Sequence, residues 1–302
     1  MGILVFDIGG TAIKYGLVSD SFEIIESNEM PTANEGGKAN AKTVLQNLDR
    51  VMTEYKGQYN AIGISTAGQV DFERGFIVYG TDNIPGFTGT DMRGIFESKY
   101  GVPVAVDNDV NCAGLGEAHF GAGRSSDYFI CLTYGTGVGG AIYLNGDLLR
   151  GAKSAAGEFG HMVTHAGGAQ CNCGRKGCYE AYASCRALTN RVSEHFGRYV
   201  SGREIYEPQM LEDPFIKQAI SDWEDEIVTG LVSLSYIFNP PLIVLGGGIM
   251  SEEILVNNIR KKLIERVGIN YQSVQLEKAQ LRNKAGMLGA AYIAKERLDS
   301  LK

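Results

Sequence analysis

The sequence repeats one local pattern: an apolar run, a glycine turn and a second apolar run. The pattern first occupies residues 3–18, with Gly9 and Gly10 in the turn, and it returns over residues 128–144. Short apolar runs bounded by glycine are typical of strands joined by tight turns. The two copies match weakly residue by residue, but their shared pattern, about 126 residues apart, predicts two lobes that each present one glycine turn.

The rest of the chain alternates short apolar runs with longer helical patterns. A length of 302 residues is comfortable for two cores. The alternation predicts an α/β fold. We expect further strands over residues 61–65, 102–106, 242–245 and 274–277, and helices over residues 38–55, 91–100, 111–120, 179–195, 252–267 and 286–298, together with a long helix that has Pro214 in its first turn and ends at Pro240.

The first glycine turn follows Asp7 and is followed by Thr11 and Lys14. Because Gly9 and Gly10 have no Cβ, the backbone amides of this turn can approach a phosphate group closely. Thr11 adds a hydroxyl donor, and the carboxylate of Asp7 could hold Mg²⁺ through water. A simple hairpin with glycine at positive φ explains the same residues. The turn alone leaves both interpretations open.

The second glycine turn contains the pattern GxGxxG, starting at Gly135-Thr136-Gly137. In a dinucleotide-binding fold these glycines open a helix. Here the apolar residues 141–144 continue as a strand, and Asn145-Gly146 then predicts a hairpin turn. The context therefore excludes a dinucleotide site and favours a hairpin that wraps phosphates. A GxxxxGK loop followed by Ser or Thr does not occur in the sequence.

A histidine and three cysteines form the most specific cluster. His161 precedes Cys171, Cys173 and Cys178, and Gly174 and Gly177 lie among the cysteines. One imidazole and three thiolates complete a tetrahedral set for Zn²⁺, and four protein ligands indicate a structural site. Buried free thiols are the alternative, but three cysteines within eight positions favour the metal.

Three carboxylates are candidates for work on a hydroxylated ligand. Asp109 follows Asn108 at the end of a predicted strand, where a carboxylate can take a hydroxyl proton during phosphoryl transfer. Taken alone, a helix-capping role for Asp109 is the stronger interpretation. Glu158 and Glu180 flank the predicted metal ligands, which could fix both side chains toward one polyol.

Composition narrows the class of protein. The net charge of −7 and the pI of about 5.3 argue against broad binding of nucleic acid or anionic membranes. No apolar run reaches the length of a membrane span, and the N-terminus enters a strand without the pattern of a signal peptide. We expect a cytoplasmic protein.

Together these motifs resemble the ROK family of repressors, open reading frames and kinases. The resemblance covers essentially the whole chain. The matching segments are DIGGT with Lys14, NDVNCAGLGE at residues 108–117, GTGVGGAIY at 135–143, GEFGH at 157–161, CNCGRKGCYE at 171–180 and NPPLIVLGGG at 239–248.

The resemblance implies the two-lobed actin-like fold of sugar kinases, with ATP and sugar in the cleft. We expect a smaller lobe of residues 1–112 plus 286–302 and a larger lobe of residues 113–285. Asp109 resembles the general base of the family. The implied sugar ligands are Gly68, Asn83, Asn108, Asp109, Glu158, His161 and Glu180, with one His161 nitrogen on zinc. The implied ATP site comprises Asp7, Gly9, Gly10, Thr11, Lys14, Gly135, Thr136, Gly137, Gly247 and Gly248.

The expected substrate is a hexose or a β-glucoside, phosphorylated at the 6-hydroxyl. Residues 81–90 should shape the rim of the sugar pocket, and they look slightly more like the glucokinase and β-glucoside kinase branch than the N-acetylmannosamine branch. Family repressors carry a helix-turn-helix domain before the first glycine turn, and because Asp7 already lies in that turn, we expect no such domain here. A sugar-sensing regulator without catalysis and a ligand-free zinc protein are the alternatives. A homodimer and lobe closure over substrate are also expected.

Overall fold

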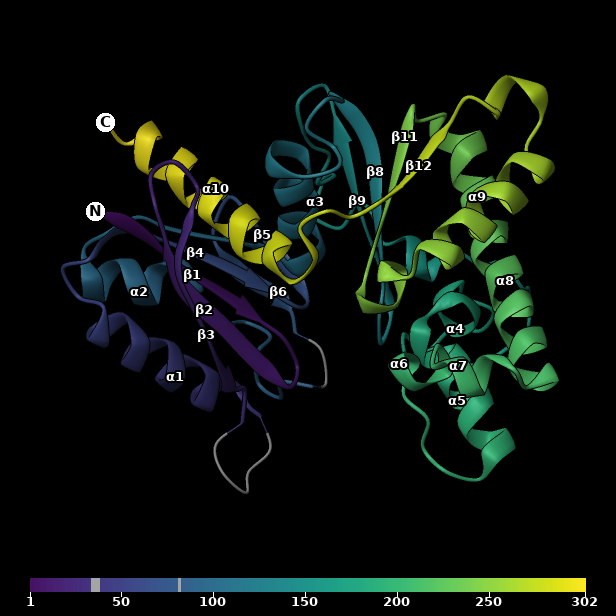
Figure 1. The fold of residues 1–302 in the computed structure, drawn as a ribbon. Coiled ribbons are helices and arrows are strands. Elements are labelled where there is room, and N and C mark those ends of the chain that lie inside the picture. Colours follow the sequence, from purple (N-terminus) through teal and green to yellow (C-terminus); the bar gives the residue numbers. More distant parts are fainter. Residues whose placement is uncertain (34–38, 81–82) are drawn as a thin grey trace. The chain divides into compact units, whose positions relative to one another are not determined.

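The computed structural model describes residues 1–33, 39–80 and 83–302, and the chain divides into two compact units (Figure 1). Unit 1 comprises Met1–Arg124, Leu148–Ala156 and Asn283–Lys302, and unit 2 comprises Ser125–Asp147 and Gly157–Arg282. The expected helix start at Lys38 and the first two residues of the expected pocket rim, Thr81 and Asp82, lie outside the described residues.

Unit 1 is built on a five-stranded sheet. Its strands are β1 (Gly2–Ile8), β2 (Ala12–Val18), β3 (Ile24–Pro31), β4 (Tyr59–Thr66) and β7 (Val104–Asn108), in the order β3-β2-β1-β4-β7. The first three strands pair antiparallel, whereas β1, β4 and β7 are parallel. A small hairpin of β5 (Gln69–Asp71) and β6 (Phe76–Tyr79) follows β4.

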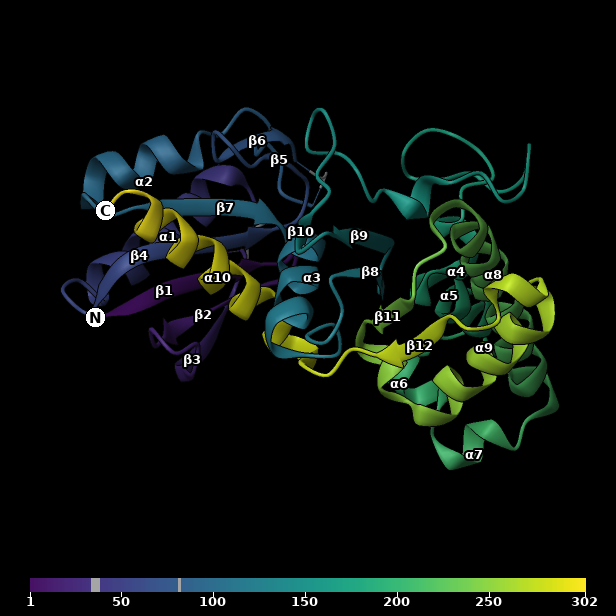
Figure 2. The same ribbon diagram turned by 90° about the horizontal axis from the view of Figure 1, so that it is seen from above.

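Helices cover both faces of the unit 1 sheet (Figure 2). Alternate side chains such as Leu4 and Phe6 form a buried cluster with α1 (Ala41–Glu54) and α2 (Met92–Tyr100). The opposite face packs against α3 (Asp109–Phe120) and the C-terminal helix α10 (Ala285–Ser300). Burial on both faces explains why β1 and β4 read as continuous apolar runs.

Unit 2 repeats the strand order of unit 1. Its sheet runs β10-β9-β8-β11-β12, from β8 (Tyr128–Tyr134), β9 (Val138–Leu144), β10 (Asp147–Leu148), β11 (Leu242–Gly246) and β12 (Gln275–Lys278). Strands β8 and β9 each begin 126 residues after β1 and β2. Both sheets place an antiparallel hairpin beside parallel strands, so the predicted internal repeat and the α/β class are confirmed.

The α-helices of unit 2 lie between its strands in the sequence. They are α4 (Glu180–Ala183), α5 (Cys185–Phe196), α6 (Gly202–Ile205), α7 (Pro208–Leu211), α8 (Pro214–Phe238) and α9 (Glu253–Arg266), with short 3-10 turns η1 (Phe159–His161), η2 (Gly248–Ser251) and η3 (Ile269–Tyr271). A further 3-10 turn, η4 (Arg282–Lys284), spans the boundary to unit 1. The long helix α8 starts at Pro214 as predicted, and Asn239 ends it in the left-handed conformation at φ 45°.

Two predicted elements differ in the structure. The helix expected over residues 179–195 breaks at Ser184, whose extended backbone ends α4 and whose hydroxyl accepts from the Ala187 amide to start α5. The second glycine turn is shorter than expected, because Gly139 and Gly140 already belong to β9. Strands β3, β5, β6 and β10 and helices α6 and α7 were not predicted.

The boundaries of the units also differ from the expected lobes. The expected cut after residue 112 would divide α3, which belongs wholly to unit 1 together with residues 148–156. Gly116 and Gly289 explain this assignment, because they let the backbones of α3 and α10 touch. The two units are nearly equal in length, so unit 1 is not a smaller lobe.

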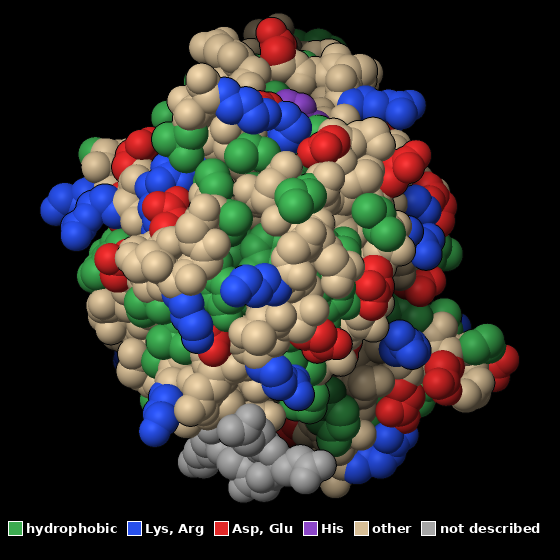
Figure 3. Space-filling view, turned by 90° about the vertical axis from the view of Figure 1, so that its left-hand side faces the viewer, with side chains coloured by type: hydrophobic (Ala, Val, Ile, Leu, Met, Phe, Trp, Pro, Cys, Tyr) green, Lys and Arg blue, Asp and Glu red, His purple; other side chains and the backbone are tan. Residues whose placement is uncertain are grey.

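Among the described residues, no helix is long and apolar enough to cross a membrane. On the face drawn in Figure 3, Lys and Arg side chains are interspersed with Asp and Glu, in line with the modest net charge of −7.

The contact of β4 with α10 yields a stability prediction. A Cβ at Gly63 would collide with the backbone carbonyl of Ala290, and neither backbone can yield without moving a buried element. We expect Gly63→Ala to lower the free energy of unfolding by about 1 to 3 kcal/mol or more, as overpacked cores do. Thermal and urea unfolding measure it. Gly268→Ala, whose Cβ meets its nearest atom only at 3.4 Å, is the control, and equal stability of the two variants would contradict this packing.

Candidate active site

The carboxyl ends of β1, β4 and β7 gather polar side chains at one edge of the unit 1 sheet. Asp7 pairs in register with Ser65, and Ser65 with Asp107. Residues in register on neighbouring parallel strands point to the same face. The Ser65 hydroxyl accordingly donates to Oδ1 of Asp7 at 2.6 Å. Asn108 and Asp109 follow directly, at the junction of β7 and α3.

The first glycine turn lies at the same edge. Its backbone is closed by the Gly9 amide, which donates to the Ala12 carbonyl at 2.9 Å, and by the buried Thr32 hydroxyl, which donates to the Gly9 carbonyl at 2.8 Å. The Asn83 side chain lies against Gly10, where an added Cβ would come within 3.3 Å of it. Lys14 stands opposite Asp7 in the β1–β2 register, and Thr11 is exposed.

Asn108, and not Asp109, caps helix α3. Its Oδ1 accepts from the amides of Val110 and Asn111 at 2.9 and 3.1 Å. Its Nδ2 donates to the Gly68 carbonyl and to Oδ1 of Asp109, both at 2.9 Å. The capping role considered for Asp109 is therefore wrong, and one carboxylate oxygen of Asp109 remains outside these bonds. Gly68 has φ 105° and packs against the backbone of Tyr79, so only glycine suits this position.

Burial and charge shift the acidity of the two aspartates at this edge. Burial, and then the neighbouring Asp7 charge, raise the pKa of Asp109 to about 6. Burial also raises the pKa of Asp7, against the opposing effects of the Ser65 hydrogen bond and the Lys14 charge. A carboxylate whose pKa lies near 6 is ionised at neutral pH and still accepts a proton readily.

In unit 2, the second glycine turn and the end of β11 lie side by side. Gly246 pairs with Thr133, and Gly247, at φ 105°, packs against the backbone of Tyr134 just before the turn. The turn itself comprises Gly135, Thr136 and Gly137, and it is closed by the Gly135 amide donating to the Gly137 carbonyl at 2.9 Å. Thr136, Gly247 and Gly248 are exposed. The structure therefore places Gly247 and Gly248 beside the turn.

Glu180 lies against the same turn, although it is only 7% exposed. Its Oε2 accepts from the Val138 amide at 2.9 Å, and the absence of a Cβ at Gly137 makes room for the carboxylate. Within the described residues its Oε1 is buried without a hydrogen bond, and Arg186 Nη2 approaches it only to 3.9 Å. A buried carboxylate oxygen without a donor is suited to accept from a ligand hydroxyl.

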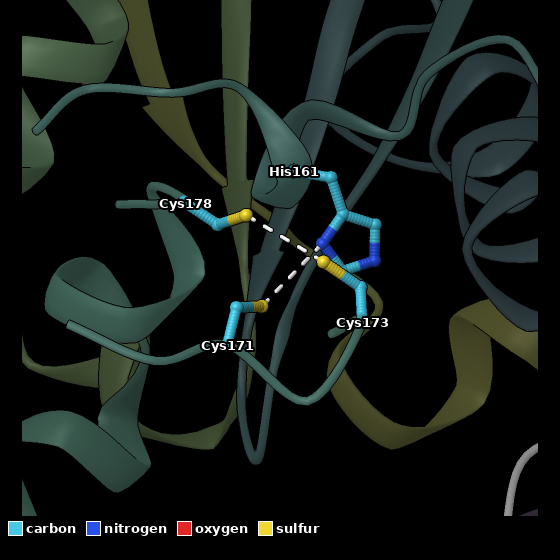
Figure 4. A group of neighbouring side chains, drawn as sticks. All are labelled: His161, Cys171, Cys173 and Cys178. Carbon is cyan, nitrogen blue, oxygen red and sulfur yellow. Dashed lines mark hydrogen bonds between the residues drawn. The ribbon is translucent and has the colours of Figure 1, made fainter. Parts of the chain in front are cut away.

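The four predicted metal ligands meet in one cluster (Figure 4). His161 Nδ1, and the Sγ atoms of Cys171, Cys173 and Cys178, all lie within 4.8 Å of one another. The Cys173 and Cys178 sulfurs are 3.6 Å apart, and the Cys171 sulfur is 3.8 Å from His161 Nδ1. Ligands at about 2.0–2.3 Å from a tetrahedral Zn²⁺ would be about 3.4–3.8 Å apart, so the donor set fits this ion. This cluster could hold a metal ion.

The loop that carries the thiols is shaped by glycine. Gly174 and Gly177 have φ 84° and 79°, and Gly177 packs directly against the His165 carbonyl. The Arg175 amide lowers the pKa of Cys173 to about 6. Burial raises the pKa of Cys171. His161 presents Nδ1 to the sulfurs, which leaves Nε2 as its second nitrogen, while Glu158, at the start of η1, is exposed.

The structure thus groups the predicted residues within each unit. Unit 1 brings together the first glycine turn, Gly68, Asn83, Asn108 and Asp109, and unit 2 brings together the second turn, Gly247, Glu180 and the metal cluster. Sequence reasoning missed Thr32, Ser65, Asp107 and Arg150, which hold these residues in place. Ser65 and Asp107 are each the penultimate residue of an apolar strand, and a polar residue near a strand's carboxyl end was the signal for both.

The raised pKa of Asp109 predicts a stability gain when its charge is removed. A carboxyl with a folded pKa of about 6 and an unfolded value of about 3.9 destabilises the protein above pH 6, and the penalty disappears as pH falls to 4. Asp109→Asn keeps the Oδ1 acceptor, so we expect it to raise the free energy of unfolding at pH 8 by about 1 to 3 kcal/mol. Unfolding measured at pH 8 and pH 5 should show the gain shrinking, and a gain independent of pH would contradict this origin.

Comparison with known proteins places the chain in a family. The model of the ROK family matches residues 3–297. The β-glucoside kinase of Listeria innocua is 34% identical, over 97% of this chain and 97% of the relative.

Solved structures agree with this match. A Listeria monocytogenes protein described as a candidate N-acetylmannosamine kinase is 33% identical and aligns with a TM-score of 0.87, over 98% of this chain and 99% of its own. A ROK family glucokinase from Streptomyces griseus, solved with glucose and AMPPNP, is 31% identical with a TM-score of 0.85, over 98% and 100%. These likenesses confirm the actin-like fold of ROK sugar kinases, and the chain belongs to the ROK family.

Proposed function

We propose that this protein is an ATP-dependent kinase that transfers the γ-phosphoryl group to a sugar hydroxyl. The observation that carries the proposal is Asp109, a carboxylate in the first turn of α3 whose pKa is raised to about 6. Phosphoryl transfer to an alcohol needs a base that takes the hydroxyl proton as the new P–O bond forms. The similarity to a glucokinase solved with glucose and AMPPNP supports the same assignment.

In this proposal Asp109 accepts the proton of the attacking sugar hydroxyl. The sugar oxygen bonds to the γ-phosphorus while the bond to the β-phosphate oxygen breaks, which yields ADP and a sugar phosphate. The Asn108 amide orients the base, because its Nδ2 donates to Asp109 Oδ1. We assign the remaining sugar contacts to Gly68 and Asn83 in unit 1 and to Glu158, His161 and Glu180 in unit 2.

The glycine turns are the proposed phosphate sites. The turn of Gly9, Gly10 and Thr11, with Lys14 beyond it, and the turn of Gly135, Thr136 and Gly137 are at least partly accessible, so their backbone can approach phosphate oxygens. Gly247 and Gly248 would face the adenosine. Bound Mg²⁺ would neutralise charge on the phosphates, and Asp7 is the residue that would hold it through water. Ser65 keeps the Asp7 carboxylate in one orientation for that role.

The metal cluster is the proposed structural zinc site. Its role would be to hold two proposed sugar ligands: His161 is itself a ligand to the metal, and Glu180 lies two residues beyond Cys178. Tyr179 lies between Cys178 and Glu180 in the chain. It is fully buried and donates its hydroxyl to the Ile227 carbonyl at 2.8 Å. The cluster is thereby tied to the core of unit 2 on one side and to the second glycine turn on the other.

The proposed acceptor is a hexose or a β-glucoside, phosphorylated at the 6-hydroxyl. The β-glucoside kinase and glucokinase among the similar proteins support this class. N-acetylmannosamine is the second candidate, because the structure with a TM-score of 0.87 is described as a candidate kinase for that sugar.

The test is ADP release with Mg-ATP and a panel of glucose, fructose, mannose, N-acetylmannosamine, cellobiose and gentiobiose. We expect turnover on one class and a fall in kcat/KM below pH 6, where Asp109 becomes protonated. Asp109→Asn should lower kcat by at least about 100-fold, the usual contribution of a general base. Asp213→Asn is the control, since Asp213 only caps α8.

Failure of the panel with a folded protein that still binds sugar would favour a regulator without catalysis. Near-normal kcat in Asp109→Asn, with normal kcat in Asp213→Asn, would remove Asp109 as the base while leaving the kinase assignment intact.

The zinc proposal is tested by elemental analysis of the purified protein. We expect one zinc per chain in the wild-type protein and little in Cys171→Ser, because a serine hydroxyl is a much poorer zinc ligand than a thiolate. Cys185→Ser is the matched control, since Cys185 lies outside the cluster. The zinc-free variant should also lose sugar affinity, and full zinc content in Cys171→Ser would contradict the ligand set.

A further inference from the structure

Asp107 is a charged side chain with no exposed surface. It is the penultimate residue of β7, two residues before Asp109, and is 0% exposed. Burial raises its pKa, while the Arg150 charge and hydrogen bonds from Asn108, Asn111 and Arg150 oppose that rise. A buried carboxylate is tolerated only where its lone pairs are filled and its charge is paired. The partners of Asp107 therefore decide whether this strand end is ordered.

Arg150 supplies the positive charge. Its Nε and Nη2 lie 3.0 and 2.9 Å from Oδ2 of Asp107, a two-pronged contact at one oxygen. The guanidinium also stacks on the Phe72 ring at 3.7 Å from its centre, and the side chain is only 15% exposed. Planar stacking together with paired N–H donors is a combination that arginine provides and lysine does not.

The other oxygen of Asp107 fixes the start of α3. Oδ1 accepts from the Asn108 amide at 2.7 Å and from Asn111 Nδ2 at 3.0 Å. Asn108 in turn caps the helix and donates to Asp109. The orientation of the Asp107 carboxylate thus sets the backbone from which both Asn108 and Asp109 project.

Arg150 lies on a loop that is fastened to unit 1 and leads to Glu158. The Ala156 amide donates to the Arg150 carbonyl at 3.0 Å and closes the loop, and Gln69 Nε2 donates to the Lys153 carbonyl at 2.7 Å to fasten it to unit 1. Residues 148–156 belong to unit 1, whereas their chain neighbours Asp147 and Gly157 belong to unit 2. Glu158, a proposed sugar ligand, is two residues beyond the end of the loop.

We propose that Arg150 is a positioning residue for the catalytic base, acting through Asp107. This inference rests on the proposed kinase function. The effect of Arg150 on the base passes through the carboxylate that it neutralises, because Asp107 holds the Asn108 amide and the Asn108 side chain donates to Asp109. Loss of the guanidinium leaves a buried charge unpaired, and the junction of β7 and α3 loses its fixed geometry.

Arg150→Met tests the proposal against a matched control, Arg93→Met. Arg93 is also a half-buried arginine of unit 1, but it donates to the backbone carbonyls of Val104 and Phe72 and not to Asp107. We expect Arg150→Met to lower kcat by about 100-fold, the effect of a misplaced reacting group, with the KM for Mg-ATP changed by less than about threefold. Arg93→Met should lower thermal stability with kcat near the wild-type value.

A double variant separates positioning from general damage. Asn at position 107 keeps an oxygen acceptor for the Asn108 amide and needs no cation. Asp107→Asn combined with Arg150→Met should therefore recover kcat to within about tenfold of wild type, a non-additivity expected only of groups that act as a pair. A double variant no better than Arg150→Met alone would overturn the proposal, as would equal losses of kcat in Arg150→Met and Arg93→Met.

Hydrogen exchange gives a readout that does not depend on turnover. The amides of residues 108, 110 and 111 should exchange faster in Arg150→Met than in Arg93→Met, because their acceptors lose a fixed position. Unchanged exchange would overturn the proposal even in an active kinase. Faster exchange in a protein that phosphorylates no sugar would support the positioning role and count against the proposed function alone.

Discussion

The parallel register of β1, β4 and β7 is the constraint on which the unit 1 site depends. It aligns Asp7 with Ser65 and Ser65 with Asp107, so that all three polar side chains point to the face covered by α3 and α10. A slip of one residue would turn each of them toward the apolar cluster of α1 and α2 and bring Ile8 or Phe6 into their place. The apolar core of unit 1 therefore fixes the position of its polar edge.

In unit 2, three consecutive residues link the metal cluster, the core and the second glycine turn. Cys178 belongs to the metal cluster, Tyr179 is anchored in the core by hydrogen bonds with Tyr134 and Ile227, and Glu180 lies against the second glycine turn. Tyr179 fits because Gly230 of α8 leaves room for its ring. Tyr179 therefore fixes the positions of the metal loop and of Glu180 relative to the core of unit 2.

The sequence predicted the elements that have strong local signals and missed those that tertiary contacts create. The doubled hairpin, α8 with its prolines, and the cysteine cluster were predicted because the residue types and spacings within each segment indicate one structure. The break at Ser184 was missed, because serine is only a weak breaker and its capping bond to Ala187 becomes visible only in the structure. The pairing of Arg150 with Asp107 joins residues 43 positions apart, and neither residue has a local pattern that indicates the other.

Three aspartates lie at one edge of the unit 1 sheet, and their different surroundings suit them to different roles. Asp107 has an arginine beside it and hydrogen bonds on both oxygens, so it serves as a fixed acceptor. Asp7 has a serine donor and a lysine opposite, and both oppose the rise that burial causes in its pKa. Asp109 has no cation among the causes that set its pKa. The charge that raises its pKa is that of another carboxylate, Asp7. Its pKa is raised to about 6, and one of its oxygens lies outside the hydrogen bonds described, which suits a carboxylate that exchanges a proton with a ligand hydroxyl near neutral pH.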